Sequence, residues 1–194
     1  MKLNIPSDGT KIGHDGEKLV VPNNPIIPYI IGDGIGIDVT PVMKRVLDYA
    51  VNKAYGNSRE IKWLELYAGS NSEDLYGSIL PEETIEAMKD YRISIKGPLT
   101  TPIGKGHKSI NVRIRQKLDL FACVRPIKYF PGTSTPMAES GLTDMVVFRE
   151  NTEDLYSGIE WEPNSPGAKR DGERLGFGVE GDACVQGRVL QRGA

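Results

Sequence analysis

The stretch PIIPYIIGDGIGIDVTPVMKRVLDYAVNKAYG, residues 25–56, sets the fold class of the chain. Its first eight residues are apolar and rich in β-branched side chains, which predicts a buried strand over 25–32. After a glycine turn, apolar residues recur every four positions, as in an amphipathic helix that packs on a core: Val42, Val46, Ala50 and Ala54. Gly56 is placed to end that helix.

The same alternation continues along the chain. Residues 60–67 alternate in polarity like a second strand, and Pro81 opens an acidic segment typical of a helix N-terminus over 81–91. A short third strand is expected at 92–97. Strand, helix, strand, helix, strand predicts an α/β domain with a largely parallel sheet. Two more strands are expected further on, at 119–130 and 144–151.

The glycine turn GDGIGID, residues 32–38, invites comparison with a dinucleotide-binding fingerprint. The comparison fails, because the third glycine and the acidic residue that closes the next strand are missing. Asp33 and the short spacing are also unlike a phosphate cradle. Two interpretations stay open: a plain turn between strand and helix, or a turn that also contacts the adenosine end of a cofactor.

The bulk composition excludes several classes of protein. The chain has 194 residues, 39% of them hydrophobic, and a formal net charge of -2, which argues against a general nucleic-acid binder. Cys123 and Cys184 match no zinc or redox spacing, so Cys123 is expected to be a buried free thiol. The N-terminus has no apolar signal core and no run is long enough to span a membrane, so we expect a cytoplasmic protein.

One segment, residues 96–116, gathers five basic side chains and no acidic one. Ser109 is a good N-cap and predicts a short helix, in which Ile110, Ile114 and Leu118 would face the core. Asn111 and Arg115 would then share a neighbouring face. A helix N-terminus with a hydroxyl, an amide and a guanidinium is suited to a carboxylate or a phosphate. The alternative is a surface helix with solvated charges.

Arg125 and Arg149 each lie at or near the end of an apolar strand, where burying the stem requires a partner for the charge. With Ser109, Asn111 and Arg115, they predict a site for a ligand with two or three carboxylates. Tyr156 would add a phenol near it, or would simply be a packed tyrosine. The two histidines, His14 and His107, have no metal-ligand spacing and are assigned to the surface.

Several of these motifs together resemble the bacterial NADP-dependent isocitrate dehydrogenases: KGPLTTP (96–102), SINVRIRQKLDL (109–120), VRP (124–126) and FRENTEDLYSGIEW (148–161). Residues 23–38 resemble the first strand and turn of the same family, and the resemblance covers about residues 20–164. It implies an incomplete isocitrate/isopropylmalate dehydrogenase-like α/β fold. The expected parts are a polar N-terminal segment (1–22), part of the large domain (23–120), the start of the small domain with a clasp region (121–164) and a glycine-rich tail (165–194).

The resemblance also implies roles for individual residues. Isocitrate would be bound by Ser109, Asn111, Arg115, Arg125 and Arg149, and Tyr156 would protonate the enol intermediate. The nicotinamide end of NADP would lie against Lys96, Leu99, Thr100 and Asn111. Ser109 matches a serine that some bacterial members phosphorylate, which would repel a substrate carboxylate. The family uses Mg²⁺ or Mn²⁺ as a Lewis acid and is dimeric, so a homodimer is expected. No metal ligand is assigned to this chain.

The family's metal-binding aspartates, its catalytic lysine and its adenosine-binding residues lie further along than residue 164. Beyond about 165 the sequence shows no periodicity, so we expect irregular structure there. The segment is either a natural tail or the product of a shifted reading frame or gene break. The chain alone is expected to lack appreciable turnover. The alternatives are a non-catalytic carboxylate-binding or regulatory subunit, and a dehydrogenase for 3-isopropylmalate or homoisocitrate. Ser109 and Asn111 favour isocitrate over a substrate with a bulky alkyl group.

Overall fold

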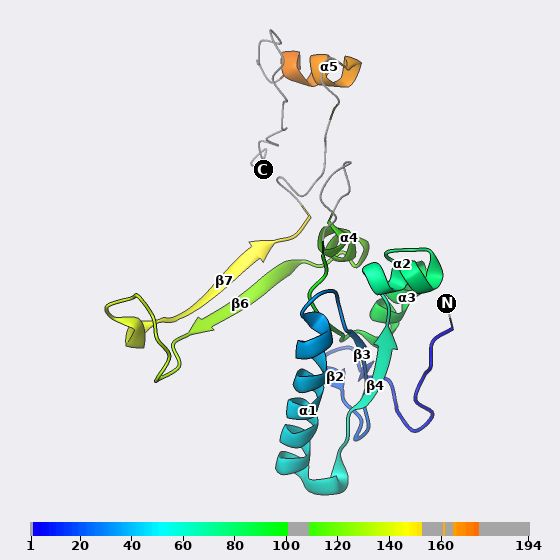
Figure 1. Ribbon diagram of the computed structural model, residues 1–194, viewed down its shortest axis with the longest axis vertical. Helices are drawn as coiled ribbons and strands as arrows, with labels where there is room; N and C mark the ends of the chain where they lie inside the picture. The colour runs from blue at the N-terminus through cyan, green and yellow to red at the C-terminus, as the bar shows by residue number, and fades with distance from the viewer. Residues whose placement is uncertain (1, 101–108, 153–160, 162–164, 175–194) are drawn as a thin grey trace. The chain divides into compact units, whose positions relative to one another are not determined.

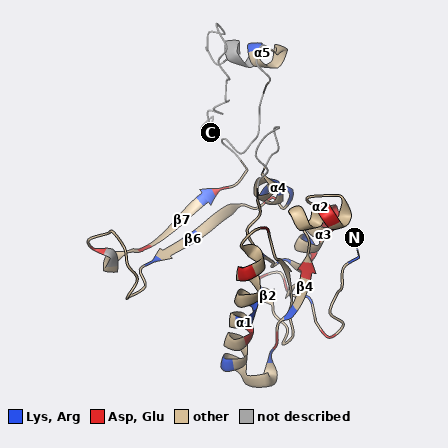
Figure 2. Cartoon of the chain, viewed as in Figure 1, with Lys and Arg blue, Asp and Glu red and all other residues tan. Residues whose placement is uncertain are grey.

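The computed structural model describes residues 2–100, 109–152, 161 and 165–174 (Figure 1). It divides into two compact units, residues 1–118 and 119–194, and each is described by itself. Within the described ranges, no helix is long and apolar enough to cross a membrane. Acidic and basic side chains are mixed along α1 (Gly36–Tyr55), as Figure 2 shows.

A three-stranded parallel sheet forms the centre of the first unit. β3 (Ile26–Ile30) lies between β4 (Lys62–Leu66) and β5 (Ile95–Lys96), and both pairs are parallel. The predicted parallel sheet is therefore confirmed. The third strand is shorter than the expected 92–97, because Arg92 has a φ of +67° and interrupts the extended backbone.

The helices between these strands follow the expected order, with one addition. α1 joins β3 to β4, with the short 3₁₀ turn η1 (Gly56–Ser58) after it, and α3 (Glu82–Tyr91) leads into β5. α2 (Ser70–Tyr76), which the sequence did not predict, lies between β4 and α3. Before the sheet, β1 (Gly13–His14) and β2 (Leu19–Val20) form a small antiparallel hairpin. His14 is exposed, as expected, and His107 lies outside the described residues.

The hydrophobic core is built from the sheet, α3 and α4 (Ile110–Lys117). It includes Ile30, Leu64, Leu66, Ile85, Ile110 and Ile114. The apolar stripe predicted for α1 does not join it. Only Gly36 and Thr40 are buried on that helix, while Val42 and Val46 are 55% and 61% exposed. The helix is confirmed, but its expected packing face is uncovered in the described part of the chain.

Two buried threonine hydroxyls hold the helices to the ends of the strands. Thr40 on α1 donates to the carbonyl of Ile31 at 2.9 Å, and Thr84 on α3 donates to the carbonyl of Tyr67 at 2.7 Å. Both carbonyls lie just beyond the end of a strand, so the threonine hydroxyls, and not a neighbouring strand, supply hydrogen bonds to them. These bonds fix where each helix begins relative to the sheet edge at which the strands end.

The second unit contains an antiparallel pair, β6 (Ala122–Lys128) and β7 (Asp144–Glu150), with the 3₁₀ turn η2 (Ser140–Leu142) before β7. Both strands were predicted. Cys123 is a free thiol, as expected, but it is only half-buried and lies 2.9 Å from the amide oxygen of Asn151. Cys184 lies outside the described residues.

The expectation of irregular structure beyond 165 is wrong for its first part. Residues 166–174 form α5 (Pro166–Arg174). Ser165 caps this helix, since its hydroxyl accepts from the backbone N–H of Ala168 at 3.2 Å, and Pro166 occupies the first helical position. These local signals outweigh the low apolar content of the segment.

Candidate functional site

The loops that follow the three parallel strands meet at the side chain of Asp33. One carboxylate oxygen accepts from the backbone N–H of Ser70 at 2.9 Å, and the other accepts from that of Thr100 at 2.8 Å. The backbone N–H of Asp33 donates to the carbonyl of Pro98 at 2.7 Å. Ligands of α/β sheets gather at this edge, so its construction bears directly on the predicted site.

Glycines allow these loops to approach one another so closely. A Cβ on Gly97 would lie 1.9 Å from the carbonyl oxygen of Ile31, and one on Gly32 would lie 2.1 Å from that of Pro98. Gly32 also has a φ of +90°, in the region that favours glycine. The GDGIGID segment is therefore a glycine turn between strand and helix, as the first interpretation states. Contact with a cofactor's adenosine end stays a prediction.

α4 begins at the N-cap residue Ser109, as predicted, with Ile110 and Ile114 buried and Leu118 packed against the core. The amide nitrogen of half-buried Asn111 donates to the carbonyl of Leu99 at 3.3 Å. Leu99 is itself buried. The helix that carries the predicted substrate residues is thereby joined to the segment that carries the predicted cofactor residues.

Lys96 and Arg115 make this edge of the sheet electropositive. The Lys96 ammonium donates to the carbonyl of Gly97 at 2.6 Å. Although Lys96 as a residue is exposed, partial burial of its ammonium lowers its pKa, the positive charge of Arg115 lowers it further, and the negative charge of Asp33 opposes both. Two cations that disfavour each other's charge are stabilised by a bound anion. Such a pair suits a carboxylate ligand.

The other two predicted arginines belong to the second unit, where the strand register relates them. Arg149 lies opposite Cys123, and Arg125 lies opposite Val147. Directly opposite residues of an antiparallel pair share a face, and positions two apart on one strand share it too. Arg125 and Arg149 are therefore diagonal neighbours on the same face of the hairpin. Arg125 is exposed and Arg149 half-buried, and Arg149 also lines a surface pocket of about 470 Å³. Tyr156 lies outside the described residues.

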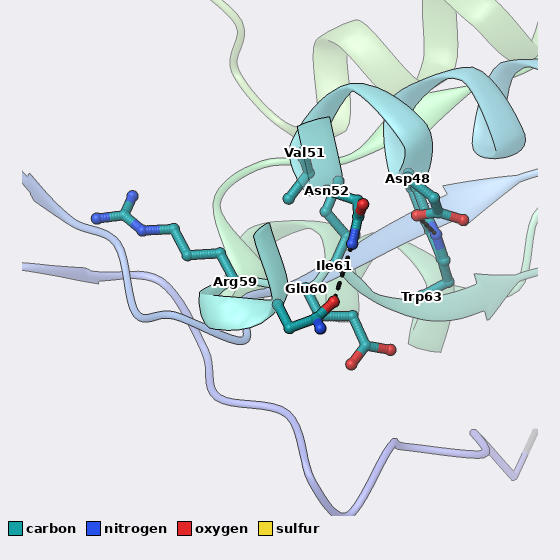
Figure 3. Close-up of a pocket in the computed structure, with 8 residues that line it drawn as sticks. Asp48, Val51, Asn52, Arg59, Glu60, Ile61 and Trp63 are labelled. Atoms are coloured by element: carbon teal, nitrogen blue, oxygen red, sulfur yellow. Dashed lines mark hydrogen bonds between the residues drawn. The ribbon is translucent and has the colours of Figure 1, made fainter. Parts of the chain in front are cut away.

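A second pocket, of about 550 Å³, contains none of the predicted residues. It is formed by the C-terminal part of α1 and the start of β4, at the end of the sheet where the strands begin (Figure 3). Several of its polar side chains form hydrogen bonds with one another. The indole N–H of Trp63 donates to Asp48 at 2.9 Å, and the amide of Asn52 donates to that of Asn57 at 3.1 Å. We do not assign it a ligand.

The described residues offer no metal site, since no three His, Cys, Asp or Glu side chains lie close enough together to hold an ion. At the sheet edge, the carboxylate of Asp33 already accepts two backbone N–H groups. Mg²⁺ and Mn²⁺ prefer several oxygen ligands. The donor set present here, an ammonium, a guanidinium, an amide and two hydroxyls, fits an anionic or amide-bearing ligand instead.

A sequence profile of the family described as isocitrate/isopropylmalate dehydrogenase matches residues 26–180. The chain belongs to this family. The match runs past residue 164, where the resemblance seen in the sequence was expected to end, and it includes α5.

Individual members of the family agree with this assignment. The chain is 55% identical over 170 residues to isocitrate dehydrogenase (NADP) 1 of Colwellia maris, and 50% identical over 164 residues to the isocitrate dehydrogenase (NADP) of Archaeoglobus fulgidus. The alignments cover 87% and 84% of this chain, but only 41% and 39% of those proteins. This family member therefore spans about two-fifths of the length of these relatives.

The fold comparison points the same way. A crystal structure of isocitrate dehydrogenase from Methylococcus capsulatus superposes with a TM-score of 0.58 and 33% sequence identity. The superposition covers 78% of this chain and 48% of that one. The expectation of an incomplete isocitrate/isopropylmalate dehydrogenase-like fold is confirmed.

Sequence reasoning missed one residue of this site. Asp33 was noted only as unlike a phosphate cradle, yet its side chain joins loops that follow two other strands. Its partners are 37 and 67 positions away, so no local pattern identifies it. The available signal was its place directly after the first strand, at the edge where ligands bind.

Proposed function

We propose that this chain supplies the substrate-binding and nicotinamide-binding part of an NADP-dependent isocitrate dehydrogenase, which oxidises and decarboxylates isocitrate to 2-oxoglutarate. The observation that carries the proposal is that Lys96, Leu99, Thr100 and α4 lie together at the carboxyl ends of the parallel strands. Several relatives named isocitrate dehydrogenase (NADP), at 49–55% identity, support this choice within the family.

Ser109, Asn111 and Arg115 would bind carboxylates of isocitrate. Ser109 and Asn111 lie at the N-terminus of α4, where backbone N–H groups favour an anion, and Arg115 lies one turn further along than Asn111. A guanidinium binds a carboxylate through two parallel hydrogen bonds. The family resemblance assigns Arg125 and Arg149 to isocitrate as well. Their shared face on the hairpin supports a common ligand.

The nicotinamide end of NADP would contact Lys96, Leu99, Thr100 and Asn111. The ammonium, the hydroxyl and the amide are donors suited to its phosphate and carboxamide groups. Tyr156 would donate a proton to the enol that remains after carbon dioxide is lost. The family resemblance implies a Mg²⁺ or Mn²⁺ ion, which would supply Lewis-acid chemistry. The described residues do not fit such an ion.

The proposal is tested by calorimetric titration of the 194-residue chain with isocitrate and, separately, with 3-isopropylmalate. We expect isocitrate to bind more tightly. Arg115→Met should weaken isocitrate binding about 10- to 100-fold, the effect of losing hydrogen bonds to a charged group. Arg113→Met, on the same helix and with the same change in charge, is the control and should weaken binding less than about threefold. Equal losses in the two variants would reduce the site to general electrostatic attraction.

Two further properties belong to the same proposal. The chain alone should form no NADPH from isocitrate, and appreciable formation would contradict the assignment of the metal-binding part to other residues. The whole protein is proposed to be a cytoplasmic homodimer. Light scattering of the purified protein would test the dimer, and a monomeric mass would contradict it.

A further inference from the structure

We propose that Asp33 is a positioning residue, whose carboxylate sets the conformation of the proposed nicotinamide-binding segment 97–100 and couples it to the start of α2. The functional consequence rests on the proposed function. The positioning itself does not rest on that function, because it consists of hydrogen bonds within the first unit.

Asp33 and Asn111 together fix three consecutive residues of that segment. The backbone of Asp33 holds the carbonyl of Pro98 at 2.7 Å, and its side chain holds the N–H of Thr100 at 2.8 Å. Between them, Asn111 holds the carbonyl of Leu99 at 3.3 Å. Hydrogen bonds to Asp33 and Asn111 therefore fix the backbone of residues 98–100. Thr100 and the nearby Lys96 are both exposed and so can meet a ligand.

The other oxygen of Asp33 performs a different task at α2. That helix begins after Gly69, which has no side chain to cap it. Asp33 accepts from the N–H of Ser70 at 2.9 Å, so it supplies from a distant loop the capping acceptor that the helix lacks. A Cβ on Gly69 would lie 2.5 Å from the Asp33 carboxylate, so glycine makes room for this contact.

The charge of Asp33 and its positioning role predict opposite effects of a substitution on the affinity for an anionic ligand. Its negative charge lies close enough to the Lys96 ammonium to raise the pKa of that group. Replacing Asp33 by a neutral residue therefore makes the edge more positive, which by itself strengthens binding of an anion such as NADP. Weaker binding after that replacement must come from a misplaced segment. The direction of the change separates the two roles.

The experiment compares Asp33→Asn with Asp38→Asn, which removes the same charge from an exposed position on the first turn of α1. Amide hydrogen exchange is followed by NMR on the 194-residue chain. The side chain in Asp33→Asn has a single, uncharged acceptor oxygen and an NH₂ group in place of the other, so the two N–H groups cannot both keep strong bonds, and we expect the amides of Ser70 and Thr100 to exchange about tenfold faster. Sheet amides of β3 and β4 should change less than about twofold, as should all of these amides in the control.

A second variant keeps the proposal falsifiable if Asp33→Asn does not fold. Ser70→Pro replaces the N–H at the first position of α2 with a ring carbon, which displaces the Asp33 carboxylate from that contact, while the first helical position itself accepts proline well. It frees one oxygen of Asp33 and should speed exchange of Thr100 about threefold, an intermediate effect. Unchanged exchange at Thr100 in either folded variant would overturn the coupling.

The functional consequence is read from binding of NADP and of isocitrate to the same proteins. Asp33→Asn should raise the Kd for NADP about tenfold while changing that for isocitrate less than about threefold. Unchanged or tighter NADP binding, with exchange at Thr100 accelerated, would overturn the positioning role. Absence of NADP binding to the unsubstituted chain would instead refute the proposed function, while the exchange rates would still decide the geometry.

Discussion

Replacing Gly97 by alanine tests the construction of the sheet edge most directly. The new Cβ would lie 1.9 Å from the carbonyl oxygen of Ile31 and 3.0 Å from that of Ile30. Both are backbone atoms, so no flexible side chain can move aside. β5 must shift away from β3 by an ångström or more, because van der Waals contact begins at about 3.5 Å.

The cost of that shift follows from the bonds it breaks. The N–H of Gly97 donates to the carbonyl of Ile30 at 2.8 Å, and the neighbouring bond from Asp33 to Pro98 depends on the same approach. Losing two such bonds, with their carbonyls left partly desolvated, costs about 2–4 kcal/mol. Because native domains are stable by only about 5–15 kcal/mol, we expect a large loss of stability without certain unfolding.

The assay is urea denaturation followed by the fluorescence of Trp63, in a Trp161→Phe background that leaves one tryptophan in the first unit. Gly77→Ala is the matched control. Gly77 has a positive φ, +66°, which Gly97 does not, but a Cβ there meets nothing within 4 Å, so only backbone strain of about 1 kcal/mol is expected. If Gly97→Ala destabilises the unit no more than Gly77→Ala does, the close approach of β5 to β3 is not a requirement of the fold.

Three further predictions concern buried groups and charge. Thr84→Val keeps the shape of the side chain but leaves the carbonyl of Tyr67 unpaired, so it should cost about 1–3 kcal/mol in urea denaturation, and a cost below about 0.5 would be inconsistent with the bond. Arg115→Met removes a nearby positive charge and should raise the pKa of Lys96, measured by NMR of its side-chain carbon, whereas an unchanged or lowered value would show that the two cations do not interact. Burial raises the pKa of Tyr29 to about 12, above its unfolded value of about 10, so its contribution to stability is complete below pH 10 and roughly 2–3 kcal/mol is lost as the pH rises through 12. Tyr29→Phe should lack this dependence, and parallel stability curves for the two proteins would refute it.

The elements that the sequence predicted well are those whose signals are local. The apolar run before residue 32, the four-residue spacing before Gly56 and the N-cap at Ser109 each act within one or two helical turns. α2 was missed because its cap comes from Asp33, 37 positions before Ser70, and not from its own sequence. The same distance hid the role of Asp33.

The apolar stripe of α1 shows a second limit. Spacing identifies which side chains share a face, but it does not say what covers that face. Val42 and Val46 are exposed, whereas the polar side chains Thr40 and Asp48 of α1 bond the carbonyl of Ile31 and the indole of Trp63. At α5 the signals were present, since Ser165 and Pro166 are a cap and a first helical residue, but low apolar content was given more weight. The relation of Arg125 to Arg149 needed the strand register, which no sequence pattern fixed.

The register of β6 and β7 also restricts how this part of the chain can change in length. Side chains alternate between the two faces with a period of two, so inserting one residue within either strand moves everything beyond it to the other face. Such an insertion between Cys123 and Arg125 would place the two arginines on opposite sides of the hairpin. Length variation among relatives should therefore be concentrated in the connection 129–143, where the register is unaffected, and be rare within the strands.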